Sequence, residues 1–317
     1  MRRARIVGLG RHAPERVLTN ADLEQMVDTS DEWITERTGI KERHITPDGQ
    51  VSSDLAAAAG RTALEAAGVT ADQLDAIILG TVTPDMPMPA TAAYVQQKLG
   101  AGRCPAFDIS AACAGFIYGL GLADGLVCRG NHQRILVIGV ELLSRVLDWT
   151  DRNTCVLFGD GAGAAVVVPG DDDERGILDV EMHTDGRHAK DLLIPGGGSL
   201  HPTSARTVDE KLHCVHMNGR QIFTQAVRNM SSAGLGVLRR CGYTADDLDL
   251  VFAHQANMRI VKGVSQQIKV PLERFFLNIH KYGNTSSASI PIAMTEALEQ
   301  GRLKRGDLIL LTALGAG

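Results

Sequence analysis

Cys113 is the side chain in this sequence whose setting is best suited to nucleophilic chemistry. It lies in a run of very small residues, 110–115, between the apolar stretch 105–107 and a long apolar helical pattern. A cysteine at such a strand-to-helix junction lies near a helix N-terminus, where free N–H groups and the helix dipole favour the thiolate. The small neighbours leave room for a substrate to reach the sulfur. We therefore take Cys113 as the candidate nucleophile; the alternative is a buried cysteine that acts only as a small hydrophobe.

An internal repeat predicts how Cys113 is positioned. Residues 68–80 and 242–254 share Gly, Thr, Ala, Asp, Leu and Asp in register, at an offset of 174 residues, and each copy ends in an apolar strand. A helical pattern precedes each copy, at 53–67 and at 222–238. A repeat on the scale of half the chain indicates two similar α/β halves, each with a helix, a turn and a buried strand.

Two further polar residues follow the second copy of the repeat. His254 lies at the carboxyl end of the apolar strand. Open α/β sheets bind their ligands at the carboxyl ends of strands. Asn284 lies 30 residues later in a second small-residue turn, and Cys113 lies 33 residues beyond Gly80, the counterpart of His254. We therefore expect Cys113 and Asn284 to occupy similar junctions that face each other across the joint between the halves. Together the three residues supply a nucleophile and two hydrogen-bond donors.

The overall composition limits the class of protein. The chain has 317 residues, of which 44% are hydrophobic and 22% charged, with a net charge of −5. This balance is typical of a globular α/β enzyme and gives no reason to expect nucleic acid or a membrane as a partner. The six scattered cysteines contain no CxxC pair, and the start of the chain lacks the apolar segment of a secretory signal. We expect reduced thiols in a cytoplasmic protein.

Three patterns resemble cofactor sites but lack an essential part. Residues 8–13 fit a dinucleotide fingerprint, yet Pro14 and an extended stretch follow instead of the required helix. The glycine-rich stretch 154–168 lacks the Lys-Ser/Thr of a phosphate loop, so its glycines indicate close backbone packing. The two histidines in 213–216 have no partner ligands nearby in the sequence. We expect no metal and no bound cofactor.

Trp33 and Arg37 fall on one face of a short helix that begins near Asp31. A flat aromatic ring beside a guanidinium can sandwich a nucleotide base and hold a phosphate. The alternative is ordinary surface packing.

As a set, these motifs resemble those of the thiolase superfamily. The set comprises Cys113 in an Ala-Ala-Cys-Ala-Gly context, the run His254-Gln-Ala-Asn257 and the run Gly283-Asn284-Thr-Ser286. More narrowly, the chain is similar over essentially its whole length to the β-ketoacyl-[acyl-carrier-protein] synthase III enzymes that initiate bacterial fatty-acid synthesis. The resemblance implies a five-layered αβαβα fold of two pseudo-symmetric halves, at 1–170 and 175–317, and a homodimer.

The resemblance also implies a reaction. Cys113 would take an acyl group, most simply acetyl, from acyl-CoA, which is a substrate rather than a cofactor. His254 and Asn284 would then hydrogen-bond the thioester carbonyl of malonyl-[acyl-carrier protein] while CO2 leaves, and the resulting carbanion would attack the acyl-cysteine. Neutral donors suit this step, because a carboxylate at the same place would oppose the developing negative charge.

By the same analogy, CoA would be held by six residues: Thr29, Trp33, Arg37, Arg152, Gly219 and Asn257. Arg259 and Lys262 would form a local basic patch that docks the acidic carrier protein. The alternative for these last two is a solvated helix face.

The chain departs from the family pattern at two places. Met88 stands where the family often has a phenylalanine that lines the acyl pocket from the partner subunit, and a flexible thioether could admit a different or longer primer. The sequence stops at Gly317, where relatives continue through a further strand. The N–H of Ala316 is expected to complete an oxyanion hole with that of Cys113.

Other members of the superfamily remain as alternatives. A degradative thiolase is disfavoured because no cysteine follows Cys241. A secondary-metabolite ketosynthase or acyltransferase with the same three residues stays open, as does a non-catalytic binding protein of the same fold. The sequence does not specify the primer.

Overall fold

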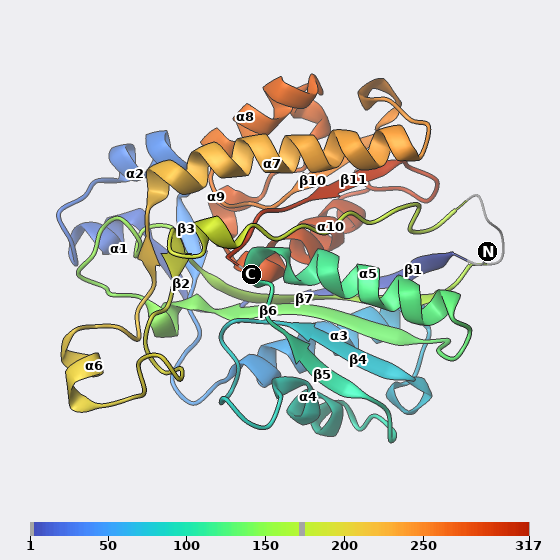
Figure 1. Ribbon diagram of the computed structural model, residues 1–317, viewed down its shortest axis with the longest axis horizontal. Helices are drawn as coiled ribbons and strands as arrows, with labels where there is room; N and C mark the ends of the chain where they lie inside the picture. The colour runs from blue at the N-terminus through green and yellow to red at the C-terminus, as the bar shows by residue number, and fades with distance from the viewer. Residues whose placement is uncertain (1–2, 171–174, 317) are drawn as a thin grey trace.

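The computed structural model describes residues 3–170 and 175–316, so the boundary between the two predicted halves, at 171–174, lies outside the described residues. The first half contains a five-stranded sheet in the order β1-β7-β6-β4-β5 (Figure 1). Its strands are β1 (Ala4–His12), β4 (Ala76–Gly80), β5 (Ala106–Ile109), β6 (Ile135–Leu142) and β7 (Asp160–Pro169). β4 pairs in parallel with β5 and β6, whereas β7 runs antiparallel to both β6 and β1.

Helices cover both faces of this sheet. α3 (Ser52–Ala67) and α4 (Thr91–Leu99) pack on the outer face, and α5 (Gly115–Cys128) and α10 (Ser289–Glu299) pack on the inner face. The alanine-rich α3 lies very close to β1, since a Cβ built on Gly8 would be 2.3 Å from the carbonyl oxygen of Ala63. The glycines that resemble a dinucleotide fingerprint therefore serve close helix–strand packing.

The second half adds two more layers. β10 (Leu250–Ala253) and β11 (Ile309–Thr312) form a parallel pair against α5 and α10, and α7 (Gly219–Arg240) and α8 (Met258–Ile268) cover the far side of that pair. The order of layers is thus α3/α4, first sheet, α5/α10, β10–β11, α7/α8, as Figure 1 shows from bottom to top. This is the predicted thiolase-like five-layered αβαβα architecture.

The 174-residue repeat extends well beyond the copies seen in the sequence. In the first half Ala76 of β4 is aligned with Ile135 of β6, and in the second half Leu250 of β10 is aligned with Ile309 of β11. Both members of the second pair lie 174 positions after their counterparts. Adding the same offset to residue 4, where β1 begins, gives residue 178.

Residues 178–182 form no assigned strand, but their side chains alternate between α7 on one side and α5 on the other. Asp179 forms an ion pair with Arg240 of α7, while Val180 lies against α5, where a Cβ on Gly121 would be 3.1 Å from its side chain. In the first half, β1 is the counterpart of this segment and β6 is the counterpart of β11, and β7 lies between β1 and β6. Among the residues that the structure describes, no strand occupies the corresponding place in the second half.

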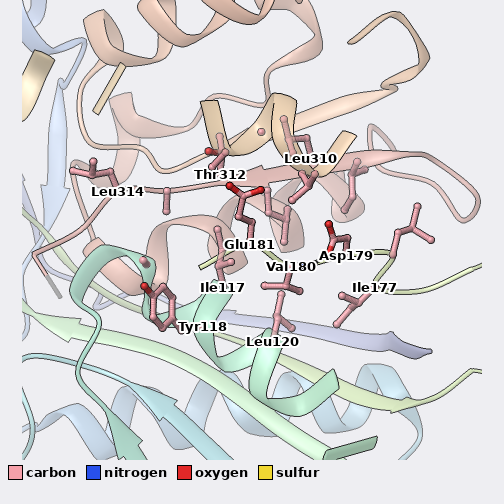
Figure 2. A pocket seen from close by; sticks show the side chains of 18 of the residues that line it. Ile117, Tyr118, Leu120, Ile177, Asp179, Val180, Glu181, Leu310, Thr312 and Leu314 are labelled. Atoms are coloured by element: carbon pink, nitrogen blue, oxygen red, sulfur yellow. Dashed lines mark hydrogen bonds between the residues drawn. The ribbon is translucent and has the colours of Figure 1, made fainter. Parts of the chain in front are cut away.

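A cavity of about 1510 Å³ takes up that place (Figure 2). β11 and the residues after it line one side, 175–181 line the other, and Ile117, Tyr118 and Leu120 of α5 lie along the inner face. Cys113, His254 and Asn284 do not line it. We therefore do not assign this space to the substrate.

The smaller elements lie outside the five layers. They are β2 (Val17–Thr19), α1 (Asn20–Glu24), α2 (Asp31–Thr38), β3 (Glu42–His44), β8 (Leu192–Leu193), α6 (Ala205–Asp209), β9 (His216–Met217) and α9 (Ile279–Tyr282). None of the helices in the described part of the chain has the length and apolar character needed to cross a bilayer.

Candidate active site

Cys113 lies in a tight turn between β5 and α5. The turn is a single 3-10 segment, Ala112–Ala114, and its first residue has the left-handed φ of 42°. Few residues other than glycine adopt such a conformation, and strain of this kind is concentrated at functional sites. Cys113 is 8% exposed. The turn thus holds the sulfur in an enclosed position immediately before a helix.

The second half contains the matching turn, Ser286–Ala288, just before α10. Ser286 has φ of 48° and lies 174 positions after Ala112. The counterpart of Cys113 is therefore Ser287; Asn284 lies three residues earlier in the same junction. The two turns are in contact, and the Ser287 hydroxyl donates to the carbonyl oxygen of Gly80 at 2.9 Å. The two junctions do lie against each other, as predicted. The residue that matches Cys113 is Ser287, however, three positions after the predicted Asn284.

Asn284 is held rigidly by its backbone and by its side-chain oxygen. Its N–H donates to the Leu157 carbonyl at 2.9 Å, and its own carbonyl accepts from the N–H of Gly159 at 3.0 Å. Its Oδ1 accepts from the N–H of Ser286 at 2.9 Å. Because the oxygen is occupied, the NH2 group is the part of this buried amide left to bind a ligand.

His254 continues β10 by one residue. Its N–H donates to the Thr312 carbonyl at 2.8 Å, and the next residue, Gln255, donates its N–H to the Ser289 hydroxyl of α10 at 2.7 Å. The ring is 2% exposed, and its Nδ1 has no partner among the described residues. Burial lowers the pKa of His254 to about 4, so the imidazole is neutral at physiological pH.

Gly315, which follows β11, joins the histidine to the cysteine. A Cβ on Gly315 would be 2.7 Å from the backbone nitrogen of Cys113, so the chain passes directly over the nucleophile turn. β10 and β11 are parallel, and His254 and Gly315 therefore leave the same edge of the pair. Ala316, the predicted second donor of the oxyanion hole, is the next residue and is exposed. A continuous set of contacts thus joins the histidine strand, the cysteine turn and the asparagine turn.

The charge state of Cys113 differs from the one expected at a helix N-terminus. The pKa of the Cys113 thiol is raised to about 11, chiefly because the group is buried; the Ser286 hydroxyl opposes this rise and the nearby Glu141 carboxylate adds to it. Burial of the sulfur therefore favours the neutral thiol over the thiolate.

Glu141 is the functional candidate that the sequence analysis missed. It is the one ionisable residue in β6, whose eight positions are all buried, and it is 0% exposed. A carboxylate inside an apolar strand was the available signal, since such groups are rarely buried without a partner.

The predicted adenine-binding residues lie together at the surface. Trp33 and Arg37 project from α2, with the Arg37 guanidinium 4.7 Å from the centre of the indole ring. Arg152 comes from a loop more than a hundred residues away and lies 5.4 Å from the same ring. Its guanidinium is held by the Asp28 carbonyl at 2.7 Å. Thr29, also predicted, has a buried hydroxyl without a partner in the described residues.

The remaining predicted ligand contacts occupy helix N-termini. Gly219 begins α7, and Asn257 caps α8 by accepting from the N–H of Arg259 at 2.8 Å. Arg259 and Lys262 are exposed one turn apart on α8, and the Arg259 guanidinium lies 5.7 Å from the centre of the Phe223 ring. Two exposed cations one turn apart form a surface that favours an acidic partner.

Met88 is the most exposed large apolar side chain of the described residues, at 83%. It lies in the segment between β4 and α4, with the partly exposed Met86 two positions earlier. Its exposure is consistent with the expectation that it acts on a partner subunit.

No cluster of three His, Cys, Asp or Glu side chains that could hold a metal ion is present within 3–170 and 175–316.

Comparison with known proteins identifies close relatives over the whole length. A family model described as 3-oxoacyl-[acyl-carrier-protein (ACP)] synthase III matches residues 107–186, and the model of its C-terminal part matches residues 238–317. The β-ketoacyl-[acyl-carrier-protein] synthase III of Symbiobacterium thermophilum is 53% identical over 312 residues, which cover 98% of this chain and 94% of that protein. The enzyme of the same name from Caldanaerobacter subterraneus subsp. tengcongensis is 51% identical over 314 residues, covering 99% and 95%.

Solved structures agree with these relatives. The crystal structure of 3-oxoacyl-[acyl-carrier-protein] synthase III from Aquifex aeolicus VF5 superposes with a TM-score of 0.90 at 46% identity, covering 99% of this chain and 96% of that one.

Proposed function

The chain belongs to the 3-oxoacyl-[acyl-carrier-protein] synthase III family, and from this premise we propose how its residues carry out the reaction. The protein is a condensing enzyme that initiates fatty-acid synthesis. We assign the nucleophile to Cys113 and the two hydrogen-bond donors to His254 and Asn284. The observation that carries this assignment is Gly315, whose position over the Cys113 nitrogen brings the histidine strand onto the cysteine turn.

In the first step, Cys113 attacks the thioester carbonyl of acyl-CoA. The sulfur–carbon bond to the enzyme forms, the bond to CoA breaks, and CoA leaves as a thiol. Negative charge develops on the carbonyl oxygen during the attack, and the N–H groups of Cys113 and Ala316 are the donors proposed to stabilise it. Gly315 is a glycine because any side chain there would collide with the nitrogen of the first donor.

In the second step, malonyl-[acyl-carrier protein] loses CO2. The electrons of the broken bond form an enolate on the thioester, which then attacks the acyl-cysteine and releases its sulfur. His254 is buried and neutral, so it donates a hydrogen bond to the enolate without adding a charge that must be desolvated. The free NH2 group of Asn284 supplies the other donor.

We place the CoA nucleotide against Trp33, Arg37 and Arg152. Two guanidiniums beside one indole ring provide both cations for phosphate and a flat surface for a base. Thr29, Gly219 and Asn257 are proposed to line the path from this surface toward the cysteine. The buried hydroxyl of Thr29 has no hydrogen-bond partner among the described residues, which supports a role for Thr29 in binding CoA.

The macromolecular partners are proposals of the same kind. Arg259 and Lys262 would dock the acidic carrier protein beside the path to Cys113. A second copy of the chain would cover Met88, whose side chain would then reach the partner's acyl pocket. The six cysteines are scattered and contain no CxxC pair, which favours a reducing compartment and supports a cytoplasmic enzyme.

The proposed activity is tested by reconstitution. The purified protein is incubated with acetyl-CoA and malonyl-[acyl-carrier protein], and the carrier protein is weighed by mass spectrometry. We expect acetoacetyl-carrier protein and an equal amount of CO2 from the wild type and neither from Cys113→Ala. Equal product formation by Cys113→Ala would reject Cys113 as the nucleophile. A panel of longer and branched acyl-CoAs in the same assay identifies the primer.

A further inference from the structure

Glu141 and Gly315 occupy equivalent positions in the two halves. They are 174 positions apart, the offset of the internal repeat; Glu141 lies near the end of β6, and Gly315 follows β11, the counterpart of β6. Gly315 lies over the turn that carries Cys113. Glu141 meets the turn Ser286–Ala288 that follows Asn284, which we call the asparagine turn. Each half thus reaches across the joint to the turn of the other half, with a glycine in one case and a carboxylate in the other.

The Glu141 carboxylate joins the two halves, with one oxygen for each. Its Oε2 accepts from two hydroxyls of the segment after β4, those of Thr83 at 2.7 Å and Thr81 at 3.4 Å. Its Oε1 accepts from two hydroxyls of the asparagine turn, those of Ser286 at 3.2 Å and Ser287 at 3.4 Å. The carboxylate therefore fixes the asparagine turn of the second half to the main sheet of the first.

The Glu141 carboxylate has no cation to neutralise it in the described part of the chain. It is 0% exposed, and each donor that it meets there is a hydroxyl or the N–H of Val82, which lies 3.2 Å from both oxygens. Burial of a charge without a counter-ion is unfavourable to folding. The donors, in contrast, fix the orientation of the carboxylate. Glu141 therefore contributes geometry at the joint rather than stability.

Ser286 connects the Glu141 carboxylate to the amide of Asn284. Its φ of 48° is a left-handed conformation that costs a residue other than glycine about 1–3 kcal/mol unless the surroundings hold it. In this conformation the Ser286 N–H donates to Oδ1 of Asn284 at 2.9 Å, while the Ser286 hydroxyl donates to Oε1 of Glu141. The side chain of Ser286 is thus anchored by Glu141, and its backbone orients the amide.

We propose that Glu141 is a positioning residue for Asn284. By holding Ser286 in its left-handed conformation, Glu141 keeps the Ser286 N–H on Oδ1 of Asn284, so that the NH2 group stays directed at the thioester oxygen of the malonyl substrate. Without this anchor Ser286 relaxes, Oδ1 loses its donor, and the amide is free to rotate away. The proposal deepens the proposed function and rests on Asn284 acting as a hydrogen-bond donor in the second step.

The test measures the two steps of the reaction separately, each in a single turnover. Acylation is the mass that the protein gains from acetyl-CoA, and condensation is the loss of that acetyl group from pre-acetylated protein on addition of malonyl-carrier protein. In Glu141→Ala we expect condensation to fall about 30-fold, a part of the roughly 100- to 1000-fold loss caused by removal of a whole donor. The loss should appear in the maximal rate and not in the half-saturating concentration of malonyl-carrier protein. Acylation should stay within about threefold of wild type, because it does not use the Asn284 donor.

Two further variants separate positioning of Asn284 from a general structural role. Glu141→Gln keeps the bridge: its amide oxygen can accept from the N–H of Val82 and its NH2 group can donate to the Ser286 oxygen, so condensation should stay within about threefold of wild type. In an Asn284→Ala background, Glu141→Ala should cause no further loss of condensation, because the amide that it positions is absent. A general structural role would add its own loss in that background.

Ser286→Ala cuts the same bridge at its middle and leaves the carboxylate in place. Alanine is compatible with this backbone, since Ala112 has the same left-handed conformation at the equivalent position of the first half. We expect the same selective loss of condensation, and this variant decides the question if Glu141→Ala does not fold. Val140→Ala is the matched control, because Val140 is equally buried in β6 but packs on the outer face with α3 and α4. It should lower the melting temperature and leave both rates unchanged.

Each outcome supports or overturns the proposal. Condensation at the wild-type rate by folded Glu141→Ala or by Ser286→Ala overturns it. Equal losses of acylation and condensation, or a further loss in the Asn284→Ala background, overturn it in favour of a general structural role. A loss in Glu141→Gln as large as that in Glu141→Ala shows that the charge matters and not the bridge. If the wild type leaves Cys113 unacylated, the proposed function itself fails.

Discussion

Substitution of Gly315 by alanine tests the geometry that joins the two halves at the nucleophile. The added Cβ would lie 2.7 Å from the Cys113 nitrogen, 3.0 Å from the Ala111 oxygen and 3.0 Å from the Ala114 nitrogen. All three atoms are backbone, so no flexible side chain can yield. Ordinary contact begins at 3.4 Å, and the segment after β11 must therefore retreat by at least about 0.7 Å. A displacement of this order at a reacting centre costs about 100-fold in rate, similar to the loss of one oxyanion-hole donor.

The assay for Gly315→Ala is single-turnover acylation by acetyl-CoA, with the melting temperature measured in parallel. Gly125→Ala is the matched control, because this glycine lies on the helix that begins at the nucleophile turn and a Cβ there meets nothing within 4 Å. We expect the control to retain full activity and to gain about 1 kcal/mol of stability from helix propensity. Wild-type acylation by a folded Gly315→Ala protein would refute the placement of this segment over Cys113.

Four other outcomes are expected. Cys113→Ala should abolish acyl transfer without changing the melting temperature by more than a few degrees, as measured by intact mass and calorimetry; an acylated variant would contradict the assignment. Folding holds the pKa of His254 at about 4 against an ordinary value of 6.5, so the unfolded chain binds the extra proton and stability falls as pH falls through this window. Wild type should therefore lose roughly 2 kcal/mol more than His254→Ala between pH 7 and pH 5 in urea unfolding, and identical losses would show that the ring is not buried neutral. Trp33→Ala should raise the KM for acyl-CoA about tenfold with little change in kcat, in line with loss of a stacking contact; an unchanged KM would place the nucleotide elsewhere. Met88→Glu should shift the protein toward a monomer in sedimentation velocity, since it puts a charge where a partner would cover an apolar side chain, and a wild-type profile would remove this residue from the interface.

The repeat made much of the fold accessible from the sequence. The offset between residues 76–80 and 250–254 predicted two matching strands, and the same offset then located β11 opposite β6. Period and composition also predicted α3 to within one residue, since the pattern 53–67 corresponds to Ser52–Ala67. These features depend on local sequence, and each occurs in two copies in the chain, so one copy supports the interpretation of the other.

What the sequence could not supply depends on contacts between distant segments. The resemblance placed the turn at Ala316 beside Cys113, but the residues alone give no sign of it; the parallel pairing of β10 with β11 is what brings Gly315 to Cys113. The register of the facing turns depends on Ser287, which carries no chemical signal of its own. A helix N-terminus favours a thiolate at Cys113, whereas burial raises the pKa of the thiol to about 11, because the cost of desolvation depends on neighbours that the local sequence does not reveal.

The central claim is tested most directly by locating the acyl group. Wild-type protein is incubated with isotopically labelled acetyl-CoA, digested, and mapped by tandem mass spectrometry; malonyl-carrier protein is then added to a parallel sample. The account predicts a single labelled thioester on Cys113 that disappears on addition of the malonyl substrate, and that persists in His254→Ala and Asn284→Ala. A label on any other cysteine, or its transfer to malonyl-carrier protein at the wild-type rate in both variants, would contradict it.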